Sequence, residues 1–235
     1  MFRVIKQNLL KNQDLRAYLK YAFGEIILVM LGILLAIQIN NWREEHKNVQ
    51  REKLILKDLN KDFSQNLEKF KSVKKFQYRT FNSGAVVFRN IQKIHIPVNR
   101  DSVYKYLPGM FGGYTYYPSN GVVESLISTG DIKYIRNDSL KKLLVSWKDV
   151  LKDYSDRVAI EIRFWSNNVE PYVIKNGDFL QISSDKNKQL AEDPVFINML
   201  VRQQHYNRNV INTIEEKDGI EHYMKEIVRL SKFNN

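Results

Sequence analysis

The strongest pattern in the chain is an apolar run near the N-terminus. Residues 23–39, FGEIILVMLGILLAIQI, include twelve consecutive apolar positions. A helix of this length spans roughly 25 Å, close to the thickness of a bilayer core of about 30 Å. Tyr18, Tyr21 and Trp42 flank the run, where interfacial aromatic residues are expected. We therefore predict a transmembrane helix over 23–39. A buried core helix is the alternative because Glu25 lies inside the run, and a cleaved signal peptide fits poorly because no small-x-small site follows.

Residues 40–95 predict a stem and the first helix of a bundle. Apolar residues recur there every seven positions on an otherwise charged helix, at Val49, Leu56, Phe63 and Phe70. Asn66 and Gln77 interrupt this stripe, which favours a bundle helix over a strict coiled coil. Asn82-Ser83-Gly84 predicts a kink. No Gly or Pro follows Trp42 until that point, so we expect the membrane helix to continue into the stem.

Residues 96–118 break the helical pattern and are expected to form an aromatic loop. They hold three of the five prolines and three of the ten glycines, together with five tyrosines. Residues 119–235 then return to helical spacing. Three helices are expected there: one that ends at Gly130, one from Asn137 or Asp138 to near Pro171, and one from Asp193 to about Arg229 with a weak point at Gly219. Residues 176–188 are polar and turn-like. The prediction is an all-α protein, an antiparallel bundle on a membrane stem.

Composition and charge refine this picture. The chain has 235 residues, no cysteine and a formal net charge of +11, and its mean hydropathy of −0.43 hides the apolar run. Without cysteine there is no disulfide, thiolate nucleophile or Cys-ligated metal. The basic excess lies in the first hundred residues, because residues 101–235 carry eighteen basic and eighteen acidic side chains. A basic segment beside a membrane helix suits anionic lipid headgroups, so we expect a lipid bilayer partner and no nucleic acid.

Lysine and arginine are almost equally frequent on the two sides of the apolar run, so their count does not orient it. Long domains translocate largely regardless of charge. The order of a basic tail (residues 1–22), an apolar segment and a large domain is that of a signal anchor. We therefore expect the tail inside the cell and the C-terminal domain in the periplasm.

Three residues of the apolar run predict a homo-oligomer face in the membrane. Gly32 and Ala36 form a small-xxx-small pair that lets two helices approach closely. Glu25 is an ionisable group inside the span, and such groups are often functional. The alternative is that Glu25, two residues into the run, reaches the headgroups.

Motifs that would carry catalysis are weak or missing. Ser139 and Lys142 match S-x-x-K, but no K-T-G or S-D-N follows, and Ser139 fits the first turn of a helix. The four histidines form no H-E-x-x-H, and no glycine-rich phosphate loop is present. Asp149, Asp153 and Asp156 lie beside basic residues at helical spacing, which favours a solvated face. We therefore expect no enzyme and no cofactor.

The aromatic loop offers the best candidate contacts. Phe111, Tyr114, Tyr116 and Tyr117 surround the Gly112-Gly113 pair, a composition typical of recognition surfaces. We predict that these side chains contact a protein partner or a small ligand. The alternative is that they pack over the end of the bundle as a lid.

The run GEIILVMLGILLAIQINNW resembles the N-terminal signature, GEIxLVxxGILxAxQINNW, of an uncharacterised family of bacterial single-pass inner-membrane proteins. A second stretch, GVVESLISTGDI followed by IRNDSL, is similar to an internal motif of that family. The resemblance implies a Gram-negative inner membrane, and no catalytic residue can be carried over. We expect a membrane-anchored helical scaffold or partner-binding protein of the envelope; the alternative is a ligand-sensing domain that acts through a partner subunit.

Overall fold

The computed structural model describes residues 13–181 and 183–232. Every regular element in them is helical, which confirms the all-α prediction. The α-helices are α2 (Gln13–Ile91), α3 (Pro97–Tyr106), α4 (Gly121–Ser128), α5 (Asp138–Phe164), α6 (Glu170–Asn176), α7 (Asp185–Glu192), α8 (Pro194–Glu215) and α9 (Ile220–Leu230). The short elements are the 3₁₀ turns η1 (Leu107–Met110) and η2 (Asp131–Tyr134) and the π-helical turn η3 (Trp165–Val169). The first part of the tail expected at 1–22 lies outside the described residues.

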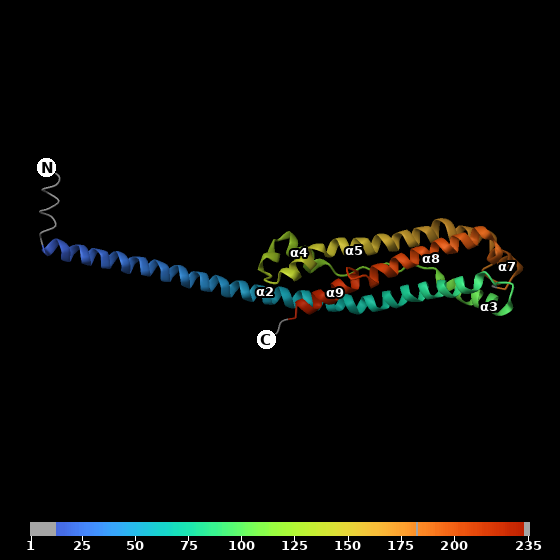
Figure 1. Cartoon of the computed structure of the whole chain (residues 1–235), viewed down its shortest axis with the longest axis horizontal. Coiled ribbons are helices and arrows are strands. Elements are labelled where there is room, and N and C mark those ends of the chain that lie inside the picture. The colour runs from blue at the N-terminus through green and yellow to red at the C-terminus, as the bar shows by residue number, and fades with distance from the viewer. Residues whose placement is uncertain (1–12, 182, 233–235) are drawn as a thin grey trace, which may run out of the picture. The chain divides into compact units, whose positions relative to one another are not determined.

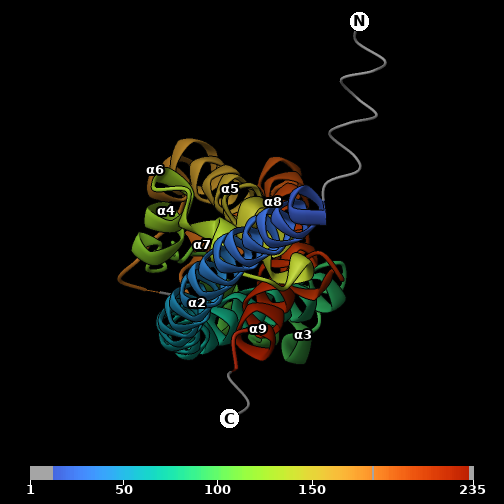
Figure 2. The same cartoon turned by 90° about the vertical axis from the view of Figure 1, so that its left-hand side faces the viewer.

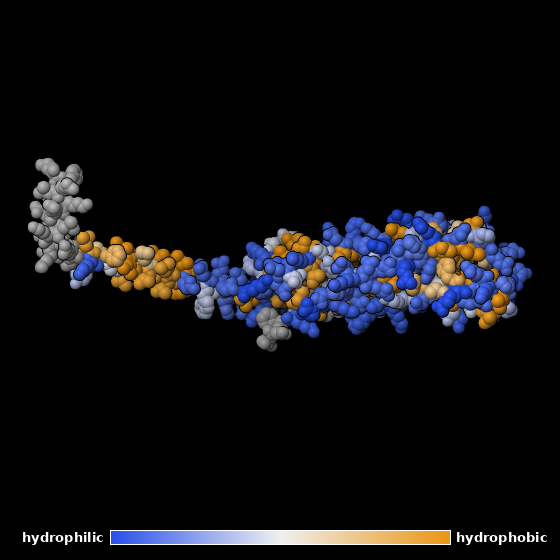
Figure 3. Space-filling view, in the orientation of Figure 1, coloured by the Kyte–Doolittle hydropathy of each residue, from blue (hydrophilic) through white to orange (hydrophobic). Residues whose placement is uncertain are grey.

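The chain divides into two compact units, residues 1–52 and 53–235. In the described part of the first unit, the apolar residues of α2 form a continuous band (Figure 3). Of the described helices, α2 alone is long and apolar enough to cross a membrane, and its most apolar window is not buried. A core helix of a soluble protein would bury that window. The segment is therefore a free apolar surface.

The second unit is a helical bundle built from the remainder of α2 together with α5, α8 and α9. Helix α5 contacts both α8 and α9, and the two views show α5 and α8 side by side (Figures 1 and 2). Figure 1 shows α8 running in the opposite direction to α5. Helix α4 lies at one end of the bundle, and α3 and α7 lie at the other.

Two separate apolar clusters form the interior of the bundle. The first core cluster contains edge-to-face aromatic pairs, with Phe63 and Trp147 at a ring-centroid distance of 5.1 Å. It includes Leu59, Phe63, Phe70, Val73, Tyr116, Leu144, Trp147, Tyr154, Val158, Val210 and Met224. The second core cluster includes Val87, Ile91, Val103, Met110, Val169, Leu190, Ala191, Phe196 and Leu200. Each cluster draws on α2 and α8, so these helices run past both.

Asn82-Ser83-Gly84, where a kink was predicted, does not end the helix, because α2 continues to Ile91. Gly84 has a packing role instead. A Cβ at this position would lie 1.8 Å from Oε1 of Gln204 on α8, so glycine allows that side chain to approach. Gln204 then donates a hydrogen bond to the carbonyl oxygen of Phe81, at 3.1 Å. The glycine therefore allows α8 to approach α2 closely.

Two further boundaries differ from expectation. The helix that was expected to end near Pro171 passes through η3 into α6, and Pro171 sits in the first turn of α6, where a missing N–H is tolerated. The expected loop at 96–118 contains α3 and η1, and the turn-like stretch at 176–188 includes the start of α7. The last expected helix divides into α8 and α9, with Gly219 as the N-cap of α9.

Asn66, one of the two interruptions in the apolar stripe, fixes the extended segment 111–120 to α2. Its side chain is fully buried. Nδ2 donates to the carbonyl oxygen of Ser119 at 2.8 Å, and Oδ1 accepts from the Ser119 N–H at 2.9 Å. The hydroxyl of Tyr116 donates to the carbonyl oxygen of Asn66 at 3.0 Å. A polar residue in the stripe therefore positions the segment that begins at Phe111.

We expect Asn66→Ala to lower the free energy of unfolding by about 2–3 kcal/mol, because it leaves two backbone groups of Ser119 without partners. Urea unfolding of the full chain in detergent, followed by circular dichroism, measures this. Gln65→Ala, which truncates an exposed neighbour, is the control and should change stability by less than about 0.5 kcal/mol. Equal effects of the two substitutions would contradict this role of Asn66.

Candidate apolar binding pocket

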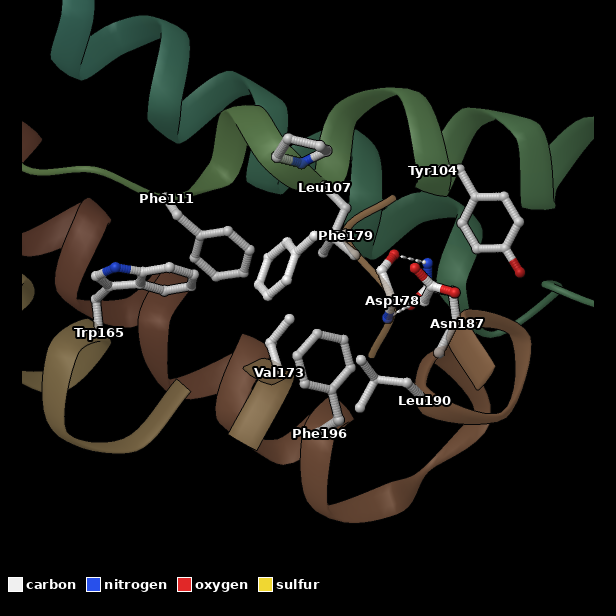
Figure 4. Close-up of a pocket in the computed structure, with 12 residues that line it drawn as sticks. Tyr104, Leu107, Phe111, Trp165, Val173, Asp178, Phe179, Asn187, Leu190 and Phe196 are labelled. Atoms are coloured by element: carbon white, nitrogen blue, oxygen red, sulfur yellow. Dashed lines mark hydrogen bonds between the residues drawn. The ribbon is translucent and has the colours of Figure 1, made fainter. Parts of the chain in front are cut away.

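A pocket of about 400 Å³ opens at the end of the bundle where η1, η3, α7 and the start of α8 meet (Figure 4). Its walls are mainly aromatic and aliphatic. They are formed by Leu107, Pro108, Phe111, Trp165, Val173, Phe179, Leu190, Ala191 and Phe196, with Tyr104, Asp178 and Asn187 as the polar members. The volume lies within the range of about 300–1,000 Å³ typical of small-molecule sites.

Phe111 and Trp165 form one wall, and each is placed by a break in regular structure. Phe111 follows η1 directly, and Trp165 is the first residue of the π-helical turn that follows α5. Their ring centroids lie 4.2 Å apart. The floor is buried, because Ala191 and Phe196 belong to the second core cluster. The pocket is therefore an opening into that cluster.

A short loop after α6 forms the mouth, and two polar residues fix its shape. Oδ1 of Asn187 accepts from the Asp178 N–H at 2.8 Å, and its Nδ2 donates to the Asp178 carbonyl oxygen at 2.7 Å. Oδ1 of Asp178 accepts from the N–H groups of Leu180 and Gln181. These bonds hold the loop so that the ring of Phe179 points toward that of Phe111 (Figure 4).

The loop leaves two large apolar side chains in water. Phe179 is 68% exposed and Leu180 is 96% exposed. Ile174 on α6 and Val195 at the start of α8 are also exposed. Figure 3 shows apolar residues at this end of an otherwise largely polar bundle. An exposed apolar rim around an apolar pocket is a feature of interaction sites.

The remaining polar wall residue, Tyr104, does not offer its hydroxyl to the pocket. Figure 4 shows the hydroxyl pointing away from the aromatic rings. This oxygen is buried without a hydrogen-bond partner among the described residues, and burial raises the pKa of Tyr104. The three polar wall residues thus leave the interior of the pocket apolar.

The structure separates the four aromatic residues proposed as contacts. Phe111 lines the pocket. Tyr116 is 4% exposed in the first core cluster, so it belongs to the interior rather than to a surface. Tyr114 and Tyr117 are exposed, and the Tyr114 ring lies 5.8 Å from that of Phe76. Only Phe111 therefore reaches the pocket.

The membrane residues Glu25, Gly32 and Ala36 lie in the first unit. Glu25 and Ala36 are exposed, and a Cβ at Gly32 would meet no described atom within 4 Å. The structure contains one chain, so the predicted oligomer face stays a prediction.

The carboxylate row of α5 is a surface feature, as expected. Asp156 forms an ion pair with Lys152, and Asp153 forms one with Arg157 at 3.2 Å. Near Ser139, the side chain of Asn137 caps α5 by accepting from the Leu140 N–H at 3.0 Å. Over residues 13–181 and 183–232, no group of three or more His, Asp or Glu side chains is arranged to hold a metal ion.

Sequence reasoning missed most of the pocket, including Trp165, Phe179 and Asn187. One signal was present. Gly177-Asp178 is a turn signal, and the two apolar residues after it stand in a polar stretch. An apolar pair directly after a turn indicates a surface loop that carries exposed apolar side chains.

These features define a class: an all-helical protein with one helix long and apolar enough to cross a membrane, and a bundle that carries an apolar pocket. The chain belongs to a family of unknown function, DUF6090, whose model matches residues 25–207. The matched range covers the expected membrane segment from Glu25 onward and the whole pocket. No curated protein and no solved structure matches the chain.

Proposed function

We propose that this protein is a membrane-anchored, non-enzymatic binding module of the bacterial envelope, which holds a protein partner by an apolar side chain inserted into the pocket. The observation that carries the proposal is the apolar pocket of about 400 Å³ with exposed apolar residues at its mouth. Binding energy in protein interfaces is concentrated in a few apolar or aromatic anchors that fill such pockets.

The exposed apolar side chains at the pocket mouth favour a protein partner over a small ligand. Phe179 and Leu180 project from the mouth loop, and Ile174 and Val195 are exposed on elements that flank it. A small molecule inside the pocket would leave these side chains in water. A protein surface that covers the mouth would bury them together with the inserted anchor.

The polar wall residues support binding over catalysis. Acid–base and nucleophilic catalysis require a polar side chain within hydrogen-bonding reach of the substrate. Asp178 and Asn187 bond to the backbone of the mouth loop, and the Tyr104 hydroxyl points out of the pocket. The wall thus presents mainly carbon atoms to an occupant.

A second candidate is an apolar small molecule, sensed by the bundle and reported through a partner subunit. The pocket volume favours it, because about 400 Å³ is sufficient for a small ligand. In this case the occupant lies against Phe111 and Trp165, and the rim residues contribute little.

A photo-reactive residue at position 180 distinguishes these candidates in native membranes. We expect it to form a cross-link to one protein, and we expect Phe179→Ser to reduce that cross-link about tenfold or more, because an anchor contact is worth about 1–2 kcal/mol or more. Mass spectrometry identifies the product. A small mass increment in place of a protein supports the second candidate.

Position 145 is the matched control, because Val145 is also a large apolar residue, 60% exposed, on α5 and outside the pocket wall. The same cross-link from both positions, or a cross-link that Phe179→Ser leaves unchanged, would contradict a specific site at the pocket. Since Phe179 is exposed, Phe179→Ser should leave the circular dichroism spectrum and the thermal midpoint nearly unchanged.

The anchored state is part of the proposal: α2 spans the inner membrane through residues 23–39, and the bundle lies in the periplasm. The exposed apolar surface of α2 supports a membrane-spanning role for residues 23–39. The periplasmic location of the bundle is supported by the general rule that long domains are translocated largely regardless of charge. A second copy of the chain, in contact through Glu25, Gly32 and Ala36, remains a proposed partner in the membrane.

The absence of cysteine allows a direct test of this topology. We expect a single introduced thiol, Leu180→Cys, to react fully with a membrane-impermeant maleimide in cells whose outer membrane is permeabilised, because this residue is 96% exposed. The cysteine-free wild-type chain is the blank. Labelling that appears only after the inner membrane is disrupted would place the bundle in the cytoplasm and overturn this part of the proposal.

A further inference from the structure

Buried polar residues cross the bundle at one level, between the two core clusters. They are Gln77 and Thr80 on α2, Glu161 on α5, and Gln203 and Asn207 on α8, each 2% exposed or less. We call these five residues the polar layer. On α2 and α8, residues of the first core cluster lie on one side of the layer and residues of the second lie on the other. On α5 the first cluster precedes Glu161, and Val169 of the second cluster follows in η3.

The polar layer is poorly satisfied. Both carboxyl oxygens of Glu161 lack a hydrogen-bond partner among the described residues, as do Gln77 Nε2, Thr80 Oγ1 and Gln203 Oε1. Asn207 is better placed, because its Nδ2 donates to the carbonyl oxygen of Met110 at 3.1 Å. An unpartnered buried polar atom is costly, and a charged one much more so. Ionisation of Glu161 in this layer is therefore strongly disfavoured.

Among the described residues, no cation acts on the pKa of Glu161. Burial alone raises its pKa, from 4.5 to about 8. The ionisable neighbour on α5 is Tyr154, whose pKa is raised mainly by burial and also by Glu161, and Tyr116 lies beyond that ring. The residues of the layer on α2 and α8 are amides and a hydroxyl. The carboxyl group of Glu161 is thus protonated and neutral at neutral pH.

A glycine segment covers this carboxyl group. A Cβ at Gly113 would lie 3.5 Å from Oε2 of Glu161 and 2.1 Å from Cγ1 of Ile162, so the backbone passes directly over α5 here. Gly112 has a φ of 107°, which residues other than glycine rarely adopt. Residues 111–120 are neither helix nor strand. Opening of this covering around Gly112 and Gly113 would therefore break no helix or strand.

We propose that Glu161 is a proton-binding switch: the neutral carboxyl keeps the Phe111–Tyr117 segment closed, and loss of the proton opens that segment so that water reaches the carboxylate. The step is a simple acid dissociation, with the proton released to solvent. Hydration of the carboxylate replaces the partners that the polar layer does not offer. The switch does not depend on the proposed partner of the pocket.

Hydrogen exchange of the full chain in detergent, measured for wild type and Glu161→Gln at each pH, tests this. Comparison at the same pH cancels the intrinsic pH dependence of amide exchange. From about pH 6 to about pH 9, opening of the segment should increase roughly tenfold to a hundredfold in wild type, because opening lets the carboxyl ionise near its ordinary pKa. In Glu161→Gln it should not change. Asp156→Asn, which removes an exposed carboxyl from the same helix, should behave as wild type.

Two further measurements keep the proposal falsifiable if Glu161→Gln folds poorly. Gly113→Ala, which would displace the segment, should exchange rapidly at both pH values. In wild type, the infrared carbonyl band of a protonated carboxyl should disappear over the same pH range as the segment opens. Three results would overturn the proposal. They are equal exchange in wild type and Glu161→Gln at pH 9, opening of the whole bundle at once, and closure that follows added Na⁺ or K⁺ rather than pH.

Discussion

Raising the pH from about 5 to about 9 is expected to lower the free energy of unfolding of wild type by on the order of 4 kcal/mol, and Glu161→Gln is expected to abolish this dependence. Glu161 has a pKa of about 8 in the folded chain against 4.5 for the ordinary side chain. Between these values the folded state keeps a proton that the unfolded state releases. The contribution of Glu161 to stability is therefore fully present below about pH 4.5, decreases as the pH rises, and is lost above about pH 8.

Urea unfolding of the full chain in detergent, repeated across this range, gives the profile. At pH 9 Glu161→Gln should be more stable than wild type, and at pH 5 the two should be similar. Ion pairs lower the pKa of Asp138 and of Glu226, so these carboxyls titrate below the range. Asp156→Asn should retain the wild-type profile. A wild-type curve that is flat from pH 5 to pH 9 would contradict a buried neutral Glu161.

We expect Trp147→Ala to lower the free energy of unfolding by about 3–5 kcal/mol and the thermal midpoint by roughly 10 °C. Trp147 is 1% exposed, packs edge-on against Phe63, and donates from Nε1 to Oδ1 of Asn120 at 2.8 Å. Its removal leaves a cavity where α2, α5 and the extended segment meet. Differential scanning calorimetry of the full chain measures the midpoint.

One variant separates the hydrogen bond of Trp147 from its packing, and a second is the control. Trp147→Phe keeps most of the ring volume but leaves the Asn120 amide oxygen without its donor, which should cost about 1–2 kcal/mol. Lys148→Ala, at an exposed neighbouring position, should change stability by less than about 0.5 kcal/mol. If Trp147→Ala were no more destabilising than Lys148→Ala, the first core cluster would not be the main support of the bundle.

The all-α fold class and the long helices of the bundle could be predicted from periodicity, whereas α3, α6 and α7 could not. The two polar interruptions of the apolar stripe were also visible in the sequence, but their roles were not. Asn66 and Gln77 weaken a coiled-coil pattern. In the structure one fixes the extended segment and the other belongs to the polar layer. Both positions could be recognised as unusual. Ser119, which bonds to Asn66, and Glu161, which shares the polar layer with Gln77, are distant from the stripe in the chain, and no local pattern connects them to it.

The pocket was harder to predict because its wall residues come from six helical elements and from two segments that connect them. Phe111 could be selected from its composition, since it stands next to two glycines in an aromatic stretch. Tyr116 lies in the same aromatic stretch, yet it is buried, and its hydroxyl bonds to the backbone of α2. Trp165 belongs to the pocket because of a π-helical turn, and hydrophobic periodicity does not reveal such a turn.

That π-helical turn has a consequence for how this family can vary. A π-helical turn is a wide turn that accommodates one residue more than an α-helical turn. Deletion of a single residue within Trp165–Val169 would therefore restore an α-helical turn and remove the wide turn that places Trp165 in the pocket wall. The pocket depends on the number of residues in this turn as much as on their identity. Natural chains that are one residue shorter at this turn should have the same bundle without the pocket.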